Sequence, residues 1–96
     1  KGHASVLSMH ETGGRKVMRI IGGLNGSLRN DFMHALTRTG VDEIDLDGVS
    51  VVDSAGIALC LVATGRHAVK LGAQSACFAE AWKKAIAVPG AMENAS

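Results

Sequence analysis

One short stretch, residues 51–57 (Val-Val-Asp-Ser-Ala-Gly-Ile), carries the side chains best placed for chemistry. Its serine, Ser54, follows a strand-like run and precedes the longest apolar-periodic segment, so it falls where a helix should begin. The first N–H groups of a helix are unpaired and carry partial positive charge, which makes them good donors to a phosphate. A phosphoryl group there would add about −1.5 to −2 charges. Ser54 is therefore predicted to be an N-cap residue and a phosphorylation switch at a protein interface.

The residues around Ser54 support an interface. Asp53 is a second residue able to cap the helix, and the small residues that follow leave the helix start open to a large neighbour. The carboxylates of Asp45, Asp47 and Asp53 are predicted to form an acidic surface that would repel a partner once Ser54 is phosphorylated. The predicted partner-binding residues are Asp47, Asp53, Ser54, Ala55, Gly56 and Ile57.

Catalysis is not predicted for this serine. A nucleophilic serine needs a base and a third orienting group, and His67 is more than three helical turns away, roughly 20 Å by helix rise. Neither G-x-S-x-G nor a glycine-rich nucleotide motif occurs. Asp45 and Asp47 have no further ligands in view for a metal. The sequence predicts a non-enzyme that uses no cofactor and no metal.

Length and composition predict a single domain spanning residues 1–96. The formal net charge is +1, the basic residues are scattered and aromatic residues are 3% of the chain, which argues against nucleic-acid binding. No apolar run is long enough for a membrane span. Cys60 and Cys77 are both predicted to be buried free thiols, which suits a reducing, cytoplasmic setting. The first residue is Lys1 rather than Met, which is typical of a processed chain or an excised domain.

Four strands are predicted from short apolar runs bounded by glycine and polar residues. Two adjacent glycines within residues 11–15 predict a hairpin between the first two strands. Three glycines within residues 22–26 predict the end of the second strand, and Gly48 is expected to bend the chain after the third. The predicted strands span residues 4–10, 16–21, 41–46 and 73–78.

Three helices are predicted from apolar periodicity. The first spans residues 28–37, with Ser27 as N-cap, Gly40 as C-terminal stop, and one apolar face made of Leu28, Phe32, Ala35 and Leu36. The second spans residues 57–71 and is closed by Gly72, with one face made of Ile57, Leu61, Thr64, Ala68 and Leu71. The third spans residues 79–88 and is stopped by Pro89 and Gly90. Gly65 is expected to mark a close packing contact. Residues 91–96 are expected to fray.

The predicted element order is β-β-α-β-α-β-α. A strand that follows a strand and a helix favours a parallel crossover, so the fold class is α/β. We expect a small mixed β-sheet of four to five strands with helices packed on one face. The short first strand leaves open whether it pairs within the chain or across a homodimer.

Residues 43–61, EIDLDGVSVVDSAGIALCL, resemble the STAS domain family, named for sulphate transporters and anti-sigma-factor antagonists. The shared pattern is an apolar strand, a small loop, D-S-x-G and an apolar helix. In the bacterial antagonists that the chain resembles, the serine matching Ser54 is phosphorylated by an anti-sigma factor with serine kinase activity. The unphosphorylated form binds that kinase and frees the sigma factor, so the resemblance implies a phosphoprotein that regulates transcription.

A second branch of the family fits a departure at Ala55, where many antagonists carry Ser or Thr. Small STAS subunits of phospholipid-transport ABC systems have similar D-[ST]-x-G-[LI]-A-L segments, which residues 53–59 resemble. In that branch the domain binds the ATPase subunit and supports transporter assembly. The resemblance thus implies one of two partners, an anti-sigma factor or an ABC ATPase.

Overall fold

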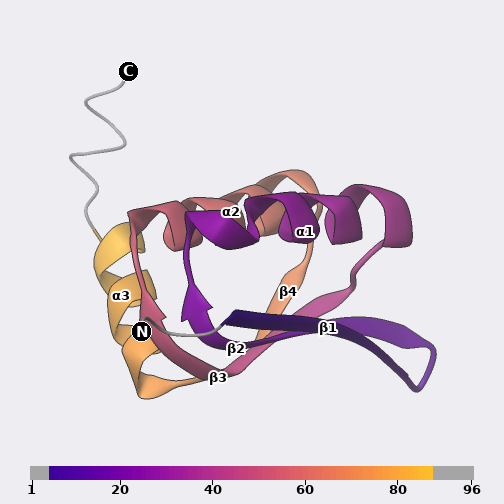
Figure 1. Ribbon diagram of the computed structural model, residues 1–96, viewed down its shortest axis with the longest axis horizontal. Coiled ribbons are helices and arrows are strands. Elements are labelled where there is room, and N and C mark those ends of the chain that lie inside the picture. Colours follow the sequence, from indigo (N-terminus) through magenta and orange to yellow (C-terminus); the bar gives the residue numbers. More distant parts are fainter. Residues whose placement is uncertain (1–4, 88–96) are drawn as a thin grey trace.

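The computed structural model describes residues 5–87, which form a four-stranded sheet with helices gathered on one of its faces (Figure 1). The strands lie side by side in sequence order: β1 (Ser5–Thr12), β2 (Arg15–Leu24), β3 (Glu43–Val52) and β4 (Lys70–Gln74). β1 and β2 are antiparallel, whereas β2, β3 and β4 are parallel. The predicted α/β class, mixed sheet and element order are confirmed. The expected helix stop at residues 89–90 and the expected fraying of residues 91–96 lie outside the described residues.

The hairpin between β1 and β2 has a turn of two residues, Gly13 and Gly14, with φ of 58° and 79°. Positive φ at both central positions matches the twist of a hairpin, and glycine adopts it without steric cost. Thr12 pairs with Arg15 across this turn, so β1 pairs with β2 of the same chain.

β2 and β3 are both longer than predicted because neither ends at its glycines. β2 continues to Leu24, with register shifts that follow Arg19 and Gly22. Gly22 has a φ of 90°, a conformation in which glycine absorbs an irregularity while pairing continues. β3 passes through Gly48, where an added Cβ would stand 2.9 Å from Cγ1 of Ile21 on β2. Gly48 therefore leaves room for the Ile21 side chain of the neighbouring strand and does not end β3.

The first helical segment has three parts: the 3₁₀ turn η1 (Gly26–Leu28), α1 (Arg29–His34) and the π-helical turn η2 (Ala35–Thr39). The prediction that Ser27 is its N-cap is wrong, because the Asn25 side chain accepts from the Ser27 N–H at 2.9 Å. The predicted apolar face is confirmed, and Gly40 ends the segment with a φ of 84°.

α2 (Ser54–Arg66) starts three residues earlier and ends five residues earlier than predicted. Its buried face is not the predicted stripe, and Leu61 is 42% exposed. The reason is that apolar residues occur on all sides of this helix, so periodicity alone does not select a face. Gly65 is exposed, and a Cβ there would meet nothing within 4 Å, so it is not the expected contact point. The buried residues are Gly56, Ile57, Leu59, Cys60 and Ala63.

The last strand and the last helix also begin three residues earlier than predicted. Leu71 and Gly72, predicted to end the second helix, belong to β4. α3 (Ala76–Ile86) begins where a strand was predicted, because Ser75 caps it by accepting from the Phe78 N–H at 3.1 Å. Phe78 is fully buried and stacks on Trp82, with ring centroids 5.7 Å apart.

The core lies between the sheet and the helices. Met18 and Ile20 of β2 and Ile44 and Leu46 of β3 are all fully buried on the face that the helices cover. The opposite face alternates with them and is half-buried or exposed, and no helix within residues 5–87 covers it. This open face carries Arg19, Asp45 and the exposed apolar pair Val6 and Ile21.

Candidate functional site at the start of helix α2

The start of α2 lies where two parallel strands end. β2 ends at Leu24 and β3 ends beside it at Val52. The Asp53 N–H then donates to the Leu24 carbonyl at 3.3 Å, which ties the strand-to-helix turn to the neighbouring strand. In open α/β sheets the carboxyl ends of parallel strands are the usual place for ligands to bind.

Asp53, and not Ser54, is the N-cap residue of α2. Its backbone is extended, with φ −116° and ψ −177°, and its Oδ1 accepts from the Gly56 N–H at 2.9 Å. Both residues are suited to capping, and the one still in extended conformation at the end of β3 takes the role. The prediction that Ser54 caps the helix is therefore wrong, because Ser54 is already the first helical residue.

Gly56 and Ile57, two predicted partner-binding residues, are buried. A Cβ at position 56 would stand 2.8 Å from the carbonyl carbon of Leu24, so glycine is what allows α2 to sit against the end of β2. Ile57 belongs to the hydrophobic core. Both residues hold the site in position, and Ala55 is the small residue here that is exposed.

Ser54 itself is exposed, and its hydroxyl makes no hydrogen bond within the described part of the chain. The N–H of Gly56 already donates to Asp53 Oδ1. Among residues 5–87, the N–H groups of Ser54 and Ala55 have no partner and remain available to an anion. A phosphoryl group on Ser54 would thus find donors at the helix start and a carboxylate, Asp53, as its immediate neighbour.

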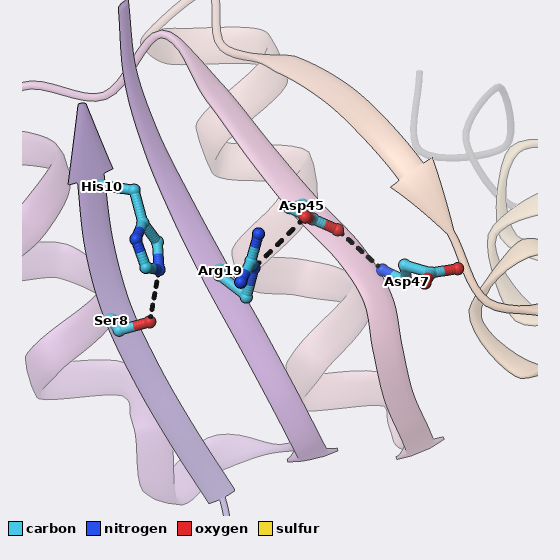
Figure 2. A network of polar contacts seen from close by, with 5 residues as sticks. All are labelled: Ser8, His10, Arg19, Asp45 and Asp47. Carbon is cyan, nitrogen blue, oxygen red and sulfur yellow. Dashed lines mark hydrogen bonds and ion pairs between the residues drawn. The ribbon is translucent and has the colours of Figure 1, made fainter. Parts of the chain in front are cut away.

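Asp47 does not lie beside Ser54. It is on the open face of the sheet, where its N–H donates to Asp45 Oδ1 at 3.0 Å and Asp45 Oδ2 pairs with Arg19 Nε at 3.3 Å (Figure 2). Asp53 is six positions further along the extended chain than Asp47, which corresponds to roughly 20 Å. The structure therefore brings Asp53, Ser54 and Ala55 together but leaves the other two aspartates elsewhere.

A groove runs beside Ser54 between the first helical segment and α2. Its volume is about 490 Å³, and it is lined by Gly26, Arg29, Met33, Ala55, Ala58, Leu59, Val62 and Arg66. Except for Ala55, these residues were missed by sequence reasoning. The spacing of Ala55, Ala58 and Val62 at i, i+3 and i+7 was the available signal for one face of α2.

One Ser–His hydrogen bond occurs in the described chain, away from Ser54. Ser8 Oγ and His10 Nε2 are 3.1 Å apart on the open face, beside Arg19 (Figure 2). Both residues lie on β1 two positions apart, and no carboxylate within residues 5–87 contacts the His10 ring. The pair lacks the orienting group that a catalytic triad requires.

The two cysteines differ in environment. Cys60 is fully buried in α2, and burial raises the pKa of its thiol to about 12. Cys77 is exposed, so its predicted burial is wrong: Phe78, the next residue of α3, faces the core in its place. Within the described residues, no three His, Cys, Asp or Glu side chains are grouped to hold a metal.

Comparison with known proteins gives no family for the chain: no protein-family model matches it, and no curated protein matches it. In residues 5–87, no helix has both the length and the apolar character needed to cross a membrane.

Proposed function

We propose that the chain is a STAS-like binding module that acts as an anti-sigma-factor antagonist in the bacterial cytoplasm. It binds an anti-sigma factor with serine kinase activity through the surface at the start of α2, and phosphorylation of Ser54 ends that binding. The module itself performs no catalysis and holds no cofactor. The observation that carries the proposal is the exposed, unbonded hydroxyl of Ser54 at the carboxyl ends of two parallel strands.

The position of Ser54 suits a switch that leaves the fold intact. Because Asp53 caps the helix, modification of Ser54 removes no hydrogen bond of the described chain. The free N–H groups of Ser54 and Ala55 favour a phosphoryl group at this helix end. The added charge lies beside the Asp53 carboxylate, and a partner packed there would have to desolvate both groups.

Phosphorylation is tested by intact-mass analysis after incubation with ATP and the cognate anti-sigma factor with serine kinase activity. We expect the mass of one phosphate to be added to the wild type and to Ser50→Ala, which removes another exposed serine nearby on β3. Ser54→Ala should gain nothing. No gain in the wild type, or a gain that survives Ser54→Ala, contradicts the proposal.

The effect of charge on binding is tested separately by titration with the same kinase. Ser54→Asp should weaken binding at least about tenfold, since a buried unpaired charge is costly at an interface. Ser54→Asn is the matched control, because it has a similar shape without the charge. Equal affinities for the two variants would show that charge at position 54 does not switch binding.

A second candidate is the STAS subunit that binds the ATPase of a phospholipid-transport ABC system. The observation that favours it is the apolar exposed surface that continues along α2 from Ala55 through Ala58 to Leu61, which suits a permanent assembly. In this case an ABC ATPase, and not a kinase, co-purifies with the chain, and Ser54→Ala leaves the complex unchanged. A gene neighbourhood with an ATPase and a permease would favour this candidate.

A further inference from the structure

The groove beside Ser54 has an apolar floor. α1 and α2 both lie above the sheet (Figure 1), and residues of both line one groove. Ala55, Ala58, Leu59 and Val62 of α2 and Met33 of α1 line the space between the two helices. Gly26 closes one end, where an added Cβ would contact the Ala55 side chain at 3.5 Å. The small side chains keep the groove open, and its volume of about 490 Å³ admits several apolar side chains of another molecule.

Two arginines flank this floor. Arg29 and Arg66 are exposed and line the groove. Neither forms an ion pair with a described residue, and both ion pairs found within residues 5–87 lie on the open face of the sheet. Arg29 is in the first turn of α1, where the partial positive charge of the helix end disfavours a cation. Local helix stability therefore does not account for its charge.

The geometry fits an elongated occupant. Ala58 and Arg66 are eight residues apart on α2, which corresponds to about 12 Å along the helix axis. Gly26 lies against Ala55, so Arg29 lies nearer the start of α2 and Arg66 nearer its end, and the two residues border different ends of the groove. An amphipathic helix presents apolar residues along one stripe and can place carboxylates about two turns apart on its borders.

We propose that this groove binds an acidic amphipathic helix of a partner protein, with its apolar stripe on the alanine-rich floor and its carboxylates on Arg29 and Arg66. Arginine forms paired hydrogen bonds with carboxylates and is a frequent anchor at interfaces. The inference deepens the proposed function, and it rests on that function for the role of Ser54. A phosphoryl group on Ser54, next to Ala55 at the groove end, would repel a partner selected for negative charge.

The test uses the full chain and a display library of helical peptides in which acidic, basic and uncharged amphipathic sequences are equally represented. Selection on the immobilised protein should enrich peptides with an apolar stripe and two acidic residues seven or eight positions apart. The dissociation constant of the best peptide is then measured by fluorescence anisotropy. Arg29→Glu and Arg66→Glu should each raise it at least about tenfold, and Ala58→Glu should abolish binding.

Arg38→Glu is the matched control. It makes the same charge change at an exposed arginine of η2 that does not line the groove, so the dissociation constant should stay within about twofold. Circular dichroism confirms that each variant is folded. Selection of no peptide, enrichment of basic or uncharged peptides, or binding unaffected by Arg29→Glu and Arg66→Glu would overturn the proposal.

A lipid is the other occupant that two arginines and an apolar groove could attract. Vesicles containing anionic phospholipid, with neutral vesicles as reference, form the second arm of the experiment. Binding to anionic vesicles that Arg29→Glu and Arg66→Glu abolish, without any selected peptide, would assign the groove to lipid and reject the helix. None of these measurements depends on the Ser54 hydroxyl. If the groove binds no acidic helix, the proposed phosphorylation of Ser54 is unaffected. If Ser54 is not phosphorylated, the proposed binding of a helix in the groove is unaffected.

Discussion

Gly56 of α2 lies directly against the backbone carbonyl of Leu24, the last residue of β2. A Cβ at position 56 would stand 2.8 Å from the carbonyl carbon of Leu24 and 2.9 Å from its Cγ. The same carbonyl accepts the N–H of Asp53. One peptide group at the end of β2 thus fixes both the turn that precedes α2 and the first turn of the helix itself.

Replacing this glycine by alanine should destabilise the protein. Gly56→Ala forces the backbone of α2 away from Leu24, and we expect the free energy of unfolding to fall by roughly 1–3 kcal/mol. Urea denaturation followed by circular dichroism measures the change. The matched control is Gly65→Ala on the same helix, where a Cβ meets nothing, and this variant should gain up to about 1 kcal/mol. Equal effects at both positions would contradict the close approach.

Capping by Asp53 predicts unequal effects at two neighbouring positions. Asp53→Ala removes the acceptor for the Gly56 N–H and should lower the free energy of unfolding by about 1 kcal/mol. Asp53→Asn retains an acceptor and should cost much less. Ser54→Ala should change stability by less than about 0.5 kcal/mol. A larger loss of unfolding free energy for Ser54→Ala than for Asp53→Ala would show that Ser54 is the capping residue.

The buried Cys60 thiol makes stability depend on alkaline pH. Its pKa is raised by burial from 9.0 to about 12, so between these values the unfolded chain loses the proton more readily than the folded chain. The free energy of unfolding should therefore be independent of this group below pH 9 and should fall as the pH rises above it, by at most about 1.4 kcal/mol per pH unit. Urea denaturation across this range measures the slope. Cys60→Ala lacks the titrating group, so wild type and variant should converge with rising pH, and a constant difference would contradict the assignment.

Thiol labelling should separate the two cysteines. The thiolate is the reactive form, and reaction also requires access. Native protein treated with a maleimide should take a single label, at exposed Cys77, and should take the second, at Cys60, only in denaturant. Cys77→Ala should remain unlabelled while folded. Rapid native labelling of that variant would show that Cys60 is accessible.

The order of elements was predictable because each strand and helix leaves a local pattern of apolar residues and turn-forming residues. The first helical segment shows this well, since Leu28 and Phe32 fall on one face in the sequence and are buried together. α2 shows the limit of the method. Leu61 is four residues after Ile57, the spacing expected on one face of a helix, yet Leu61 is exposed. The neighbours that select the buried face come from distant parts of the chain.

The location of the candidate site was predictable, but several of its details were not. The D-S-x-G segment pointed to the start of a helix, and the structure puts Ser54 there. Which residue caps the helix depended on where the extended backbone of β3 ends, a matter of a single residue. The distance of Asp47 from Ser54 depended on how far β3 continues past Gly48, and the groove depended on how α1 and α2 are placed relative to each other, since Met33 and Ala58 line it from different helices. Apart from the spacing of Ala55, Ala58 and Val62 on one face of α2, none of these has a local signature in the sequence.

The division of roles among Asp53, Ser54 and Gly56 has a consequence for how this protein can change. Asp53 secures the helix and Gly56 admits it to the end of β2, whereas the side chain at position 54 supports neither. Folding therefore places almost no demand on that side chain. Substitutions at position 54 should therefore change stability little, so a strong constraint on this residue would have to arise from something other than folding.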